Sequence, residues 1–333
     1  MTVVVTGASG HIGANLVRDL VAAGRRVRVL VHRNRRPLEG LDVEVAAGDV
    51  MDPGSVADAF RDAEVVYHLA GVISLSERRA STIHAVNVAG TANVLRAAAH
   101  SGVRRLVHCS SIHAYDLRGA RRVDEHTPQV PEGSRHHAAY DRSKAAGERM
   151  VRAAVERGLD AVIVNPTSVI GPSDFEPSRM GRFFLAFARG RLPALVRGGF
   201  DFVDVRDVSA ALQAAEVRGR PGEGYLVGGH FRTVVELGAM AAAATGRRAP
   251  RLAVPLAVAG LVAPAAEAIA RRSGTEPLFG RGSLAVLRTG TPVDSGRAAA
   301  ELGHRPRDTA DTVRAVYDWF ASMGWVERRG LTR

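Results

Sequence analysis

The sequence predicts an α/β protein, in which a doubly wound parallel sheet is followed by a smaller, mostly helical C-terminal lobe. Two observations support this fold class. Short apolar strands alternate with helical segments through the first half of the chain, and a glycine-rich turn joins the first predicted strand to the first helix. Parallel strands need crossover helices between them, so this alternation is the expected signature of such a sheet. With 333 residues, 46% of them hydrophobic, the chain is large enough to bury its core.

The predicted elements follow in order along the chain. We expect strands at 3–6, 27–31, 43–47, 65–70, 105–110 and 161–165, and helices at 12–23, 83–100 and 141–157. After Asn165 a segment rich in Pro, Gly and Ser predicts a long excursion, before a strand at 202–205 and a helix at 207–217. From 221 the chain is Ala-rich and largely helical. We therefore predict a sheet domain of 1–165 plus 201–220, and a substrate-binding lobe of 166–200 plus 221–333.

Composition restricts the classes of partner and compartment. The formal net charge is +11, but arginines are spread over the chain with acids between them, so we expect no nucleic-acid partner. Cys109 is the only cysteine, which excludes an intramolecular disulfide and favours a reducing, cytoplasmic location. The apolar stretch from Leu252 is interrupted by Pro255, Gly260 and Pro264, so it predicts a buried helix of the second lobe and no membrane span.

Three glycines follow the first strand in "VVVTGASGHIG": Gly7, Gly10 and Gly13. Glycines allow a tight turn and bring the N-terminus of the following helix against a pyrophosphate. In a strand–turn–helix context at the start of an alternating chain, this spacing predicts a Rossmann-type dinucleotide site.

The second strand indicates which dinucleotide is bound. An acid about 20 residues past the glycines would bind the adenosine ribose of NAD, whereas a basic residue would pair with the 2'-phosphate of NADP. No acid occurs between Asp19 and Glu39. The segment instead supplies four basic side chains: His32, Arg33, Arg35 and Arg36. NADP is therefore favoured, with NAD possible.

Lys144 is the only lysine among 45 basic side chains, and Tyr140 precedes it by four residues. On a helix this spacing puts both side chains on one face. A tyrosine that donates a proton to a carbonyl needs a pKa well below its usual value of about 10, which a nearby cation promotes. A compact ammonium can also bind a cofactor ribose and relay a proton, which a guanidinium does poorly.

Motifs along nearly the whole chain resemble those of one family. They are "TGASGHIG" at 6–13, "GDVMD" at 48–52, "HLAG" at 68–71, "NVAGTANVL" at 87–95, "HCSSIHAY" at 108–115, "YDRSK" at 140–144, "NPTSVIGP" at 165–172, "FVDVRDVSAA" at 202–211 and "AAAELGHRPR" at 298–307. With them the chain is identified as a member of the extended short-chain dehydrogenases/reductases. The resemblance is to their NAD(P)-dependent group of epimerases, dehydratases and dihydroflavonol-reductase-like enzymes.

The resemblance implies a catalytic set. Tyr140 would be the general acid/base, Lys144 would lower its pKa and bind the ribose, Ser111 would bind the reacting carbonyl, and Asn87 would support the proton relay. Two plainer alternatives stay open, in which Ser111 merely closes a strand and Asn87 satisfies hydrogen bonds inside a helix.

The resemblance also implies a cofactor-binding set. Asp49 and Val50 would meet the adenine, Leu69 and Ala70 the neighbouring ribose, and the segment from Pro166 to Val169 the nicotinamide. The full predicted set is Gly7, Gly10, His11, Ile12, Gly13, His32, Arg33, Asp49, Val50, Leu69, Ala70, Gly71, Tyr140, Lys144, Pro166, Ser168 and Val169.

Three functions remain open. The first is NADP-dependent reduction of a ketone or aldehyde on a moderately apolar molecule, or the reverse oxidation. The second is epimerisation or dehydration of a sugar or nucleotide sugar, and the third is cofactor sensing without chemistry. Phe200 stands where nucleotide-sugar enzymes usually carry an arginine clamp, and "NPTSVIGP" is similar to flavonoid- and steroid-type reductases, so the first is preferred. Against it, 171–194 is similar to hopanoid-associated sugar epimerases and has three arginines suited to phosphate: Arg179, Arg182 and Arg189.

Other candidate sites are weaker. His136 and His137 lack a carboxylate at metal-ligand spacing, so we predict no metal site. Cys109 follows a buried strand and is predicted to pack rather than to react. By analogy, a homodimer through the helices at 83–100 and 141–157 is possible, and the expected partner is a small-molecule substrate.

Overall fold

Seven parallel strands form the main sheet of the computed structural model, in the order β10-β6-β5-β4-β1-β2-β3. The structure describes residues 1–74, 77–272, 280, 284, 287–288 and 290–327. The strands are β1 (Thr2–Thr6), β2 (Arg26–Val31), β3 (Glu44–Ala47), β4 (Ala63–His68), β5 (Arg105–Cys109), β6 (Ala161–Pro166) and β10 (Gly224–Val227). This order is that of a doubly wound Rossmann-type sheet, and it confirms the predicted fold class.

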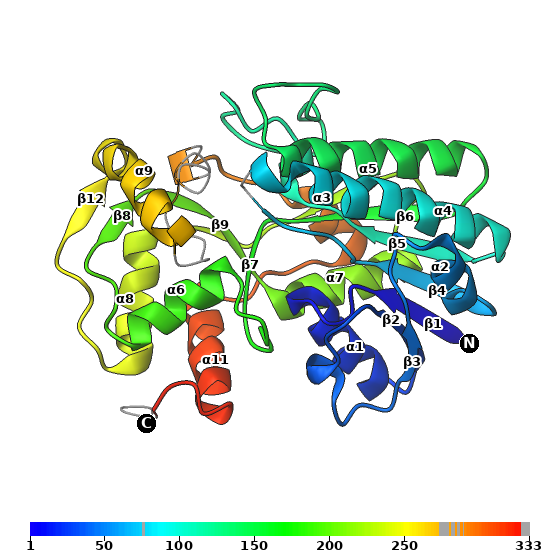
Figure 1. Ribbon diagram of the computed structural model, residues 1–333, viewed down its shortest axis with the longest axis horizontal. Helices are drawn as coiled ribbons and strands as arrows, with labels where there is room; N and C mark the ends of the chain where they lie inside the picture. The colour runs from blue at the N-terminus through cyan, green and yellow to red at the C-terminus, as the bar shows by residue number, and fades with distance from the viewer. Residues whose placement is uncertain (75–76, 273–279, 281–283, 285–286, 289, 328–333) are drawn as a thin grey trace.

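Helices cover both faces of this sheet, as Figure 1 shows. One face packs against α1 (His11–Ala22) and α7 (Val205–Arg218). The other packs against α2 (Pro53–Ala59), α4 (Gly90–His100) and α5 (Ala139–Glu156). A short helix α3 (Ala80–His84) and a π-helical turn η3 (Ala85–Ala89) lead into α4. The predicted helices at 12–23, 83–100 and 141–157 are therefore confirmed to within a few residues.

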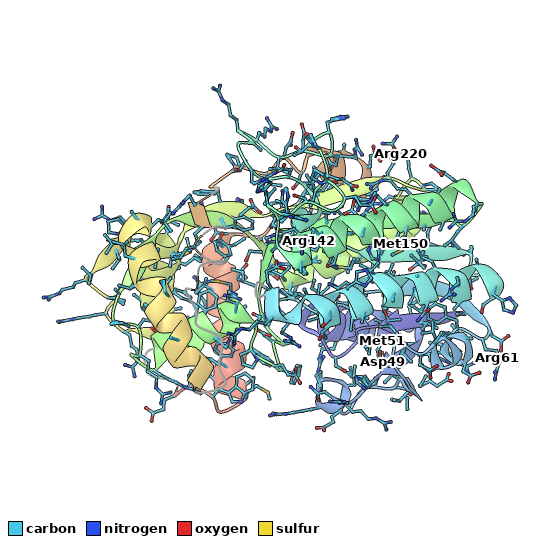
Figure 2. All side chains as sticks on the ribbon, turned by 45° about the horizontal axis from the view of Figure 1, so that its top comes forward. Asp49, Met51, Arg61, Arg142, Met150 and Arg220 are labelled. Atoms are coloured by element: carbon cyan, nitrogen blue, oxygen red, sulfur yellow. The ribbon has the colours of Figure 1, made fainter. Side chains whose placement is uncertain are left out.

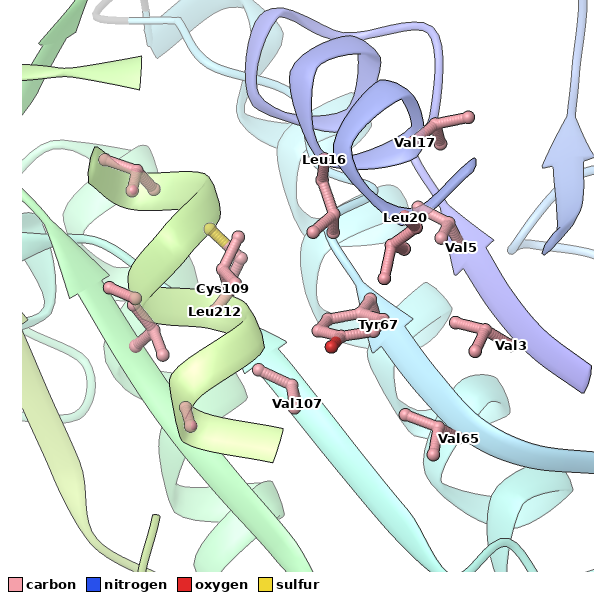
Figure 3. Packing of buried hydrophobic residues seen from close by; sticks show 14 of the residues in the cluster. Val3, Val5, Leu16, Val17, Leu20, Val65, Tyr67, Val107, Cys109 and Leu212 are labelled. Atoms are coloured by element: carbon pink, nitrogen blue, oxygen red, sulfur yellow. The ribbon is translucent and has the colours of Figure 1, made fainter. Parts of the chain in front are cut away.

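The core on the α1/α7 face is built from alternate strand residues. Val3, Val5, Val65 and Val107 point to this face because side chains alternate along a strand, and all four are fully buried (Figure 3). Tyr67 lies among them, and its hydroxyl donates to Glu216 Oε2 at 2.5 Å. The buried phenol is thus satisfied without water.

The remaining chain builds the lobe on the left of Figure 1. Strand β9 (Gly199–Asp204) pairs with β7 (Ser168–Ile170) and with β11 (His230–Thr233), and β8 (Leu195–Arg197) pairs with β12 (Ala253–Pro255). The helices are α6 (Arg179–Ala188), α8 (Val234–Thr245), α9 (Leu256–Arg272) and α11 (Thr309–Ser322). Short 3-10 turns at Arg36–Leu38, Glu77–Arg79 and Ile112–Ala114 and a π-turn at Ala298–Leu302 complete the assigned elements.

Two strands differ from the sequence expectation in their sheet. The strand predicted at 202–205 exists as β9, but it belongs to the three-stranded sheet. Strand β10 joins the main sheet beside β6, although the chain after 221 was expected to be largely helical and part of the lobe. A four-residue apolar strand between glycine turns carries too little pattern to stand out from its Ala-rich surroundings. The proposed domain boundaries otherwise stay a prediction.

The apolar stretch from Leu252 contains a helix of the second lobe, as expected, but this helix is only partly buried. It forms β12 and α9, but α9 lies at the outer edge of the lobe and buries only one side, through Ala259 and Ala263. Leu261 is 81% exposed and Val262 59% exposed. Among the described residues, no helix is long and apolar enough to cross a membrane.

Candidate active site

The glycine turn between β1 and α1 has no room for a side chain at Gly7 or Gly13. Gly7 has φ of +71°, and a Cβ there would lie 2.5 Å from the backbone nitrogen of Ala70. A Cβ on Gly13 would overlap the carbonyl oxygen of Gly7. Helix α1 starts at His11 directly after this turn, so its first unsatisfied N–H groups lie at the turn. The turn thus fits a dinucleotide pyrophosphate, as the sequence predicts.

The basic loop after β2 lies against the glycine turn. The Ser9 hydroxyl donates to the carbonyl oxygen of Asn34, in the middle of this loop. Arg33 and its neighbours Arg35 and Arg36 are exposed, and His32 Nε2 lies 3.6 Å from Asp49 Oδ2. Four basic side chains and the glycine turn therefore share one region, where the adenosine end of a dinucleotide would lie.

Residues after β3 continue this region. The backbone N–H of Met51 donates to Asp49 Oδ1 at 2.9 Å, which fixes the turn that Figure 2 labels at these two residues. Val50 is buried, and its carbonyl accepts a hydrogen bond from Asn93 of α4 at 2.9 Å. Asp49 and Val50 are therefore held next to the basic loop, as predicted for an adenine site.

The segment after β4 connects the two ends of the site. Leu69 and Ala70 donate their N–H groups to the backbone and side-chain oxygens of Thr6, at 3.1 and 3.3 Å. A Cβ on Gly71 would lie 3.7 Å from Lys144 Nζ. Three consecutive residues thus run from the glycine turn to the predicted catalytic lysine.

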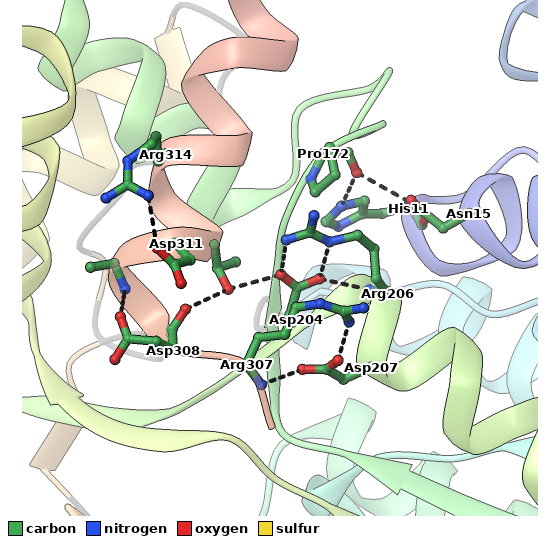
Figure 4. Close-up of polar contacts among 12 residues, drawn as sticks. His11, Asn15, Pro172, Asp204, Arg206, Asp207, Arg307, Asp308, Asp311 and Arg314 are labelled. Atoms are coloured by element: carbon green, nitrogen blue, oxygen red, sulfur yellow. Dashed lines mark hydrogen bonds and ion pairs between the residues drawn. The ribbon is translucent and has the colours of Figure 1, made fainter. Parts of the chain in front are cut away.

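The segment after β6 returns to the first helix. Pro166 ends β6, and Ser168 and Val169 begin β7. His11 Nε2 lies 3.0 Å from the carbonyl oxygen of Pro172, which Asn15 also contacts (Figure 4). These contacts hold the predicted nicotinamide-side segment against the start of α1, so His11 has a structural partner in the chain itself.

Ser111, Tyr140 and Lys144 meet at the carboxyl end of β5. Ser111 follows this strand, whereas Tyr140 and Lys144 occupy the first turns of α5. The Ser111 side chain is near enough to the Tyr140 phenol to lower its pKa, and Lys144 Nζ donates to the carbonyl oxygen of Cys109 at 3.0 Å. All three side chains are buried. The structure thus brings together three residues that span 33 positions of the sequence, from Ser111 to Lys144.

Burial controls the protonation of this group. It raises the pKa of Tyr140, which the neighbouring Ser111 side chain opposes only in part. Burial also lowers the pKa of Lys144. The sequence analysis expected Lys144 to depress the pKa of the phenol, but the ammonium is directed at Cys109, and desolvation dominates. Tyr140 is thus a neutral phenol at neutral pH, the form that donates a proton.

Asn87 lies in the π-helical turn η3 and joins three segments. Its Oδ1 accepts from the Val72 N–H at 2.7 Å, and its Nδ2 donates to the Val72 carbonyl at 3.0 Å and to Ser143 Oγ at 3.0 Å. A Cβ on Gly71 would lie 3.4 Å from Asn87 Oδ1. Asn87 therefore positions the loop above Lys144 and the helix that carries it.

His113 belongs to the site but was not predicted from the sequence. Its Nδ1 lies 2.9 Å from Asp141 Oδ1, and its ring lies 5.5 Å from the Tyr140 ring and 6.3 Å, stacked, from Phe200. The sequence feature that could have indicated its role is its position two residues after Ser111, in "SSIHAY". His113 and Phe200 thus place an aromatic surface beside the catalytic phenol.

Two buried histidines behind Lys144 were also missed. His68 lies between Thr6 and Thr91, with ring nitrogens 2.8 and 3.0 Å from their hydroxyl oxygens. Burial, together with Lys144, lowers the pKa of His68 to about 3 and lowers that of His108. Both rings are therefore neutral at neutral pH.

The weaker candidates lie outside this arrangement. Cys109 is buried and burial raises its pKa to about 11, so its thiol packs in the core as expected. His137 contacts Asp116 at 3.1 Å, and in the described residues no cluster suited to a metal ion is found. Arg189 lines a surface cavity of about 950 Å³, together with Arg191 and Arg247, and no predicted site residue lines it.

Comparison with known proteins agrees with this geometry. Residues 3–228 match the model of the NAD dependent epimerase/dehydratase family. A sterol demethylase protein B of Methylococcus capsulatus is 39% identical over 98% of this chain and 100% of its own length. A ceramide reductase of Caulobacter vibrioides is 30% identical over 98% of this chain and 96% of its own.

A solved structure shares the whole fold. The crystal structure of gox2253 superposes with a TM-score of 0.84 at 34% identity, covering 98% of this chain and 99% of that one. The chain is therefore an NAD(P)-dependent enzyme of the extended short-chain dehydrogenase/reductase type, and it belongs to the NAD-dependent epimerase/dehydratase family.

Proposed function

We propose that the protein reduces a ketone or aldehyde on a small, moderately apolar molecule, with NADPH as the hydride donor. The observation that carries this proposal is the buried Ser111–Tyr140 pair, with Lys144 one helical turn away and the His113 and Phe200 rings beside it. A neutral phenol is the correct protonation state for donating a proton to a carbonyl oxygen.

The residues of the chain divide the chemistry as follows. A bound NADPH supplies the hydride that the carbonyl carbon receives. Tyr140 gives its proton to the carbonyl oxygen, and Ser111 donates a hydrogen bond to that oxygen as negative charge develops. Lys144, whose Nζ donates to the Cys109 carbonyl at 3.0 Å, would bind the cofactor ribose and relay a proton back to the tyrosine. The same residues run the reverse oxidation, because each step is reversible.

The choice of NADPH rests on the loop after β2. Its arginines and His32 are near the glycine turn, and the stretch between Asp19 and Glu39 contains no acid to bind a free ribose. An arginine fork pairs with a phosphate through two hydrogen bonds. Arg33 is the residue that we assign to the 2'-phosphate.

The choice of an apolar substrate rests on Phe200. An arginine there would clamp a diphosphate, whereas the buried phenyl ring offers apolar contact. Two relatives, named as a sterol demethylase protein and a ceramide reductase, carry lipid names, which supports a substrate of this class.

Single-turnover assays at 340 nm with a panel of ketones test the proposal. The wild type should consume NADPH in preference to NADH, and Tyr140→Phe should be slower by about 10²- to 10⁴-fold. Tyr317→Phe is the matched control, because this buried tyrosine donates to Phe184 in the lobe core. Product formation without net loss of absorbance would instead establish the epimerase alternative.

A further inference from the structure

Helix α9 exposes an apolar face to solvent. Val258, Leu261 and Val262 lie three and four residues apart, so they share one side of the helix. Their exposed fractions are 48%, 81% and 59%, and Leu252, just before β12, is 61% exposed. From Leu252 to Ala266 the sequence contains no charged residue. We call Leu252, Val258, Leu261 and Val262 the α9 patch.

The opposite side of α9 holds the helix on the lobe. Ala259 and Ala263 are buried and pack with Val196 of β8 and with Leu284. In Figure 1, α9 and β12 lie at the end of the lobe farthest from β1 and β2. The α9 patch therefore faces outward from a fixed helix, away from the cofactor region. Exposed aliphatic side chains gathered on one element indicate an interaction surface.

Unpaired arginines border the patch. Arg251 directly precedes Leu252, and Arg197 is the ladder partner of Pro255 at the start of α9. Both are exposed, and within the described ranges neither forms an ion pair. Several arginines around the main sheet are, in contrast, paired with acids, such as Arg28 with Glu44 at 2.7 Å.

We propose that the α9 patch and the arginines beside it attach the protein peripherally to an anionic lipid bilayer. The apolar side chains enter the boundary between headgroups and acyl chains, while Arg197 and Arg251 contact lipid phosphates. A symmetric contact with a second copy is disfavoured, since it would bring the same unpaired arginines together around the patch. An anionic surface satisfies both the charge and the apolar face.

The attachment face is connected to the candidate active site. Leu256 at the base of α9 lies 3.3 Å from the position of a Cβ on Gly198, two residues before Phe200. Phe200 stacks on His113, which contacts Tyr140. Through this connection we expect the bilayer to supply an apolar substrate to the site. That expectation rests on the proposed function, whereas attachment to the bilayer does not.

Vesicle flotation of the full chain tests the inference. The probes are phosphatidylcholine vesicles and phosphatidylcholine vesicles containing phosphatidylglycerol. Wild-type protein should float with the anionic vesicles and much less with the neutral ones, and added salt should weaken flotation. Leu261→Glu should reduce partitioning by about tenfold or more. The matched control is Val217→Glu, a change at a 75% exposed aliphatic residue of α7, which should float as the wild type does.

Circular dichroism and NADPH binding show that each variant is folded. Absence of wild-type flotation, or equal loss in both glutamate variants, would overturn the proposal. So would a wild-type dimer that Leu261→Glu converts to a monomer without any vesicle binding, because the patch would then be a self-association surface. The assay contains no NADPH or substrate, and Tyr140→Phe should float normally. Failure of attachment is thereby distinguished from failure of the proposed reaction.

Discussion

The identity of the cation at position 144 is the sharpest test of the proposed chemistry. Replacing Lys144 with arginine keeps a positive charge in the same helix position. It removes the ammonium that donates to the Cys109 carbonyl at 3.0 Å, and it puts a broader group below Gly71, where a Cβ would lie 3.7 Å from Nζ. The side chain is 9% exposed, so the larger group has little room to relax.

The expected magnitude follows from these contacts. A hydrogen bond from a charged donor contributes about 1.5–3 kcal/mol, so displacing the cation from its position should reduce kcat/KM by about 10- to 150-fold. Overpacking a buried site costs about 1–3 kcal/mol of the free energy of unfolding, or a Tm lower by about 2–4 °C per kcal/mol.

Lys144→Met separates charge from shape. It removes the ammonium, and because burial lowers the pKa of Lys144, the folded state is penalised for that charge at neutral pH. Lys144→Met should therefore lose turnover while its Tm stays equal or rises. The assay is single-turnover NADPH oxidation, with Tm from calorimetry. Lys144→Arg activity within about threefold of the wild type, in a folded protein, would refute the argument that this site requires a lysine.

Three further changes test other parts of the molecule. Arg33→Ser should weaken NADPH binding by about tenfold or more and leave NADH binding unchanged. The control is Arg121→Ser, a change at an exposed arginine far along the chain, which should alter neither affinity. Equal affinities of the wild type for both nucleotides would contradict the assignment. Gly13→Ala should lower both NADPH affinity and Tm, since its methyl group would overlap the glycine turn, and normal binding would show that the turn is not the pyrophosphate site. Because burial lowers the pKa values of His68 and His108, the unfolded chain binds protons below about pH 6.5 that the folded chain does not. Stability should therefore be complete above that pH and fall on acidification by about 1.4 kcal/mol per pH unit for each ring, and His108→Leu should flatten the profile measured by Tm between pH 4.5 and 8.

The sequence predicted those features that depend on local pattern. The glycine turn, the strands of the main sheet other than β10, and the Tyr140–Lys144 pair all follow from spacing within one or two elements. The hydrophobic periodicity of the sequence could not show that one side of α9 is exposed, because its burial depends on whether other elements pack against that side. It also could not assign β10, whose neighbour β6 lies about 60 positions earlier in the chain.

Contacts between distant segments explain what was missed in the site. His113 gains its role from Asp141 and Phe200, residues that lie 28 and 87 positions away. The pKa of Tyr140 was expected to be depressed because the sequence showed a cation nearby but not where it points. In the structure that cation is held by the Cys109 carbonyl, and burial decides the outcome.

Helix α5 explains why so much of the site depends on one segment. Asp141 holds His113, Ser143 accepts from Asn87, and Lys144 donates to the end of β5. One turn later the buried Glu148 accepts from Asn165, whose amide also donates to the Ser111 carbonyl at 3.1 Å. These polar residues therefore tie the ends of β5 and β6 and the turn η3 to the helix that carries Tyr140. Burying them costs stability, as the raised pKa of Glu148 and the lowered pKa of Lys144 indicate. Such a cost in stability is expected at an active site, where the reacting group must be held in position before the substrate arrives. The group then needs no further positioning on the way to the transition state.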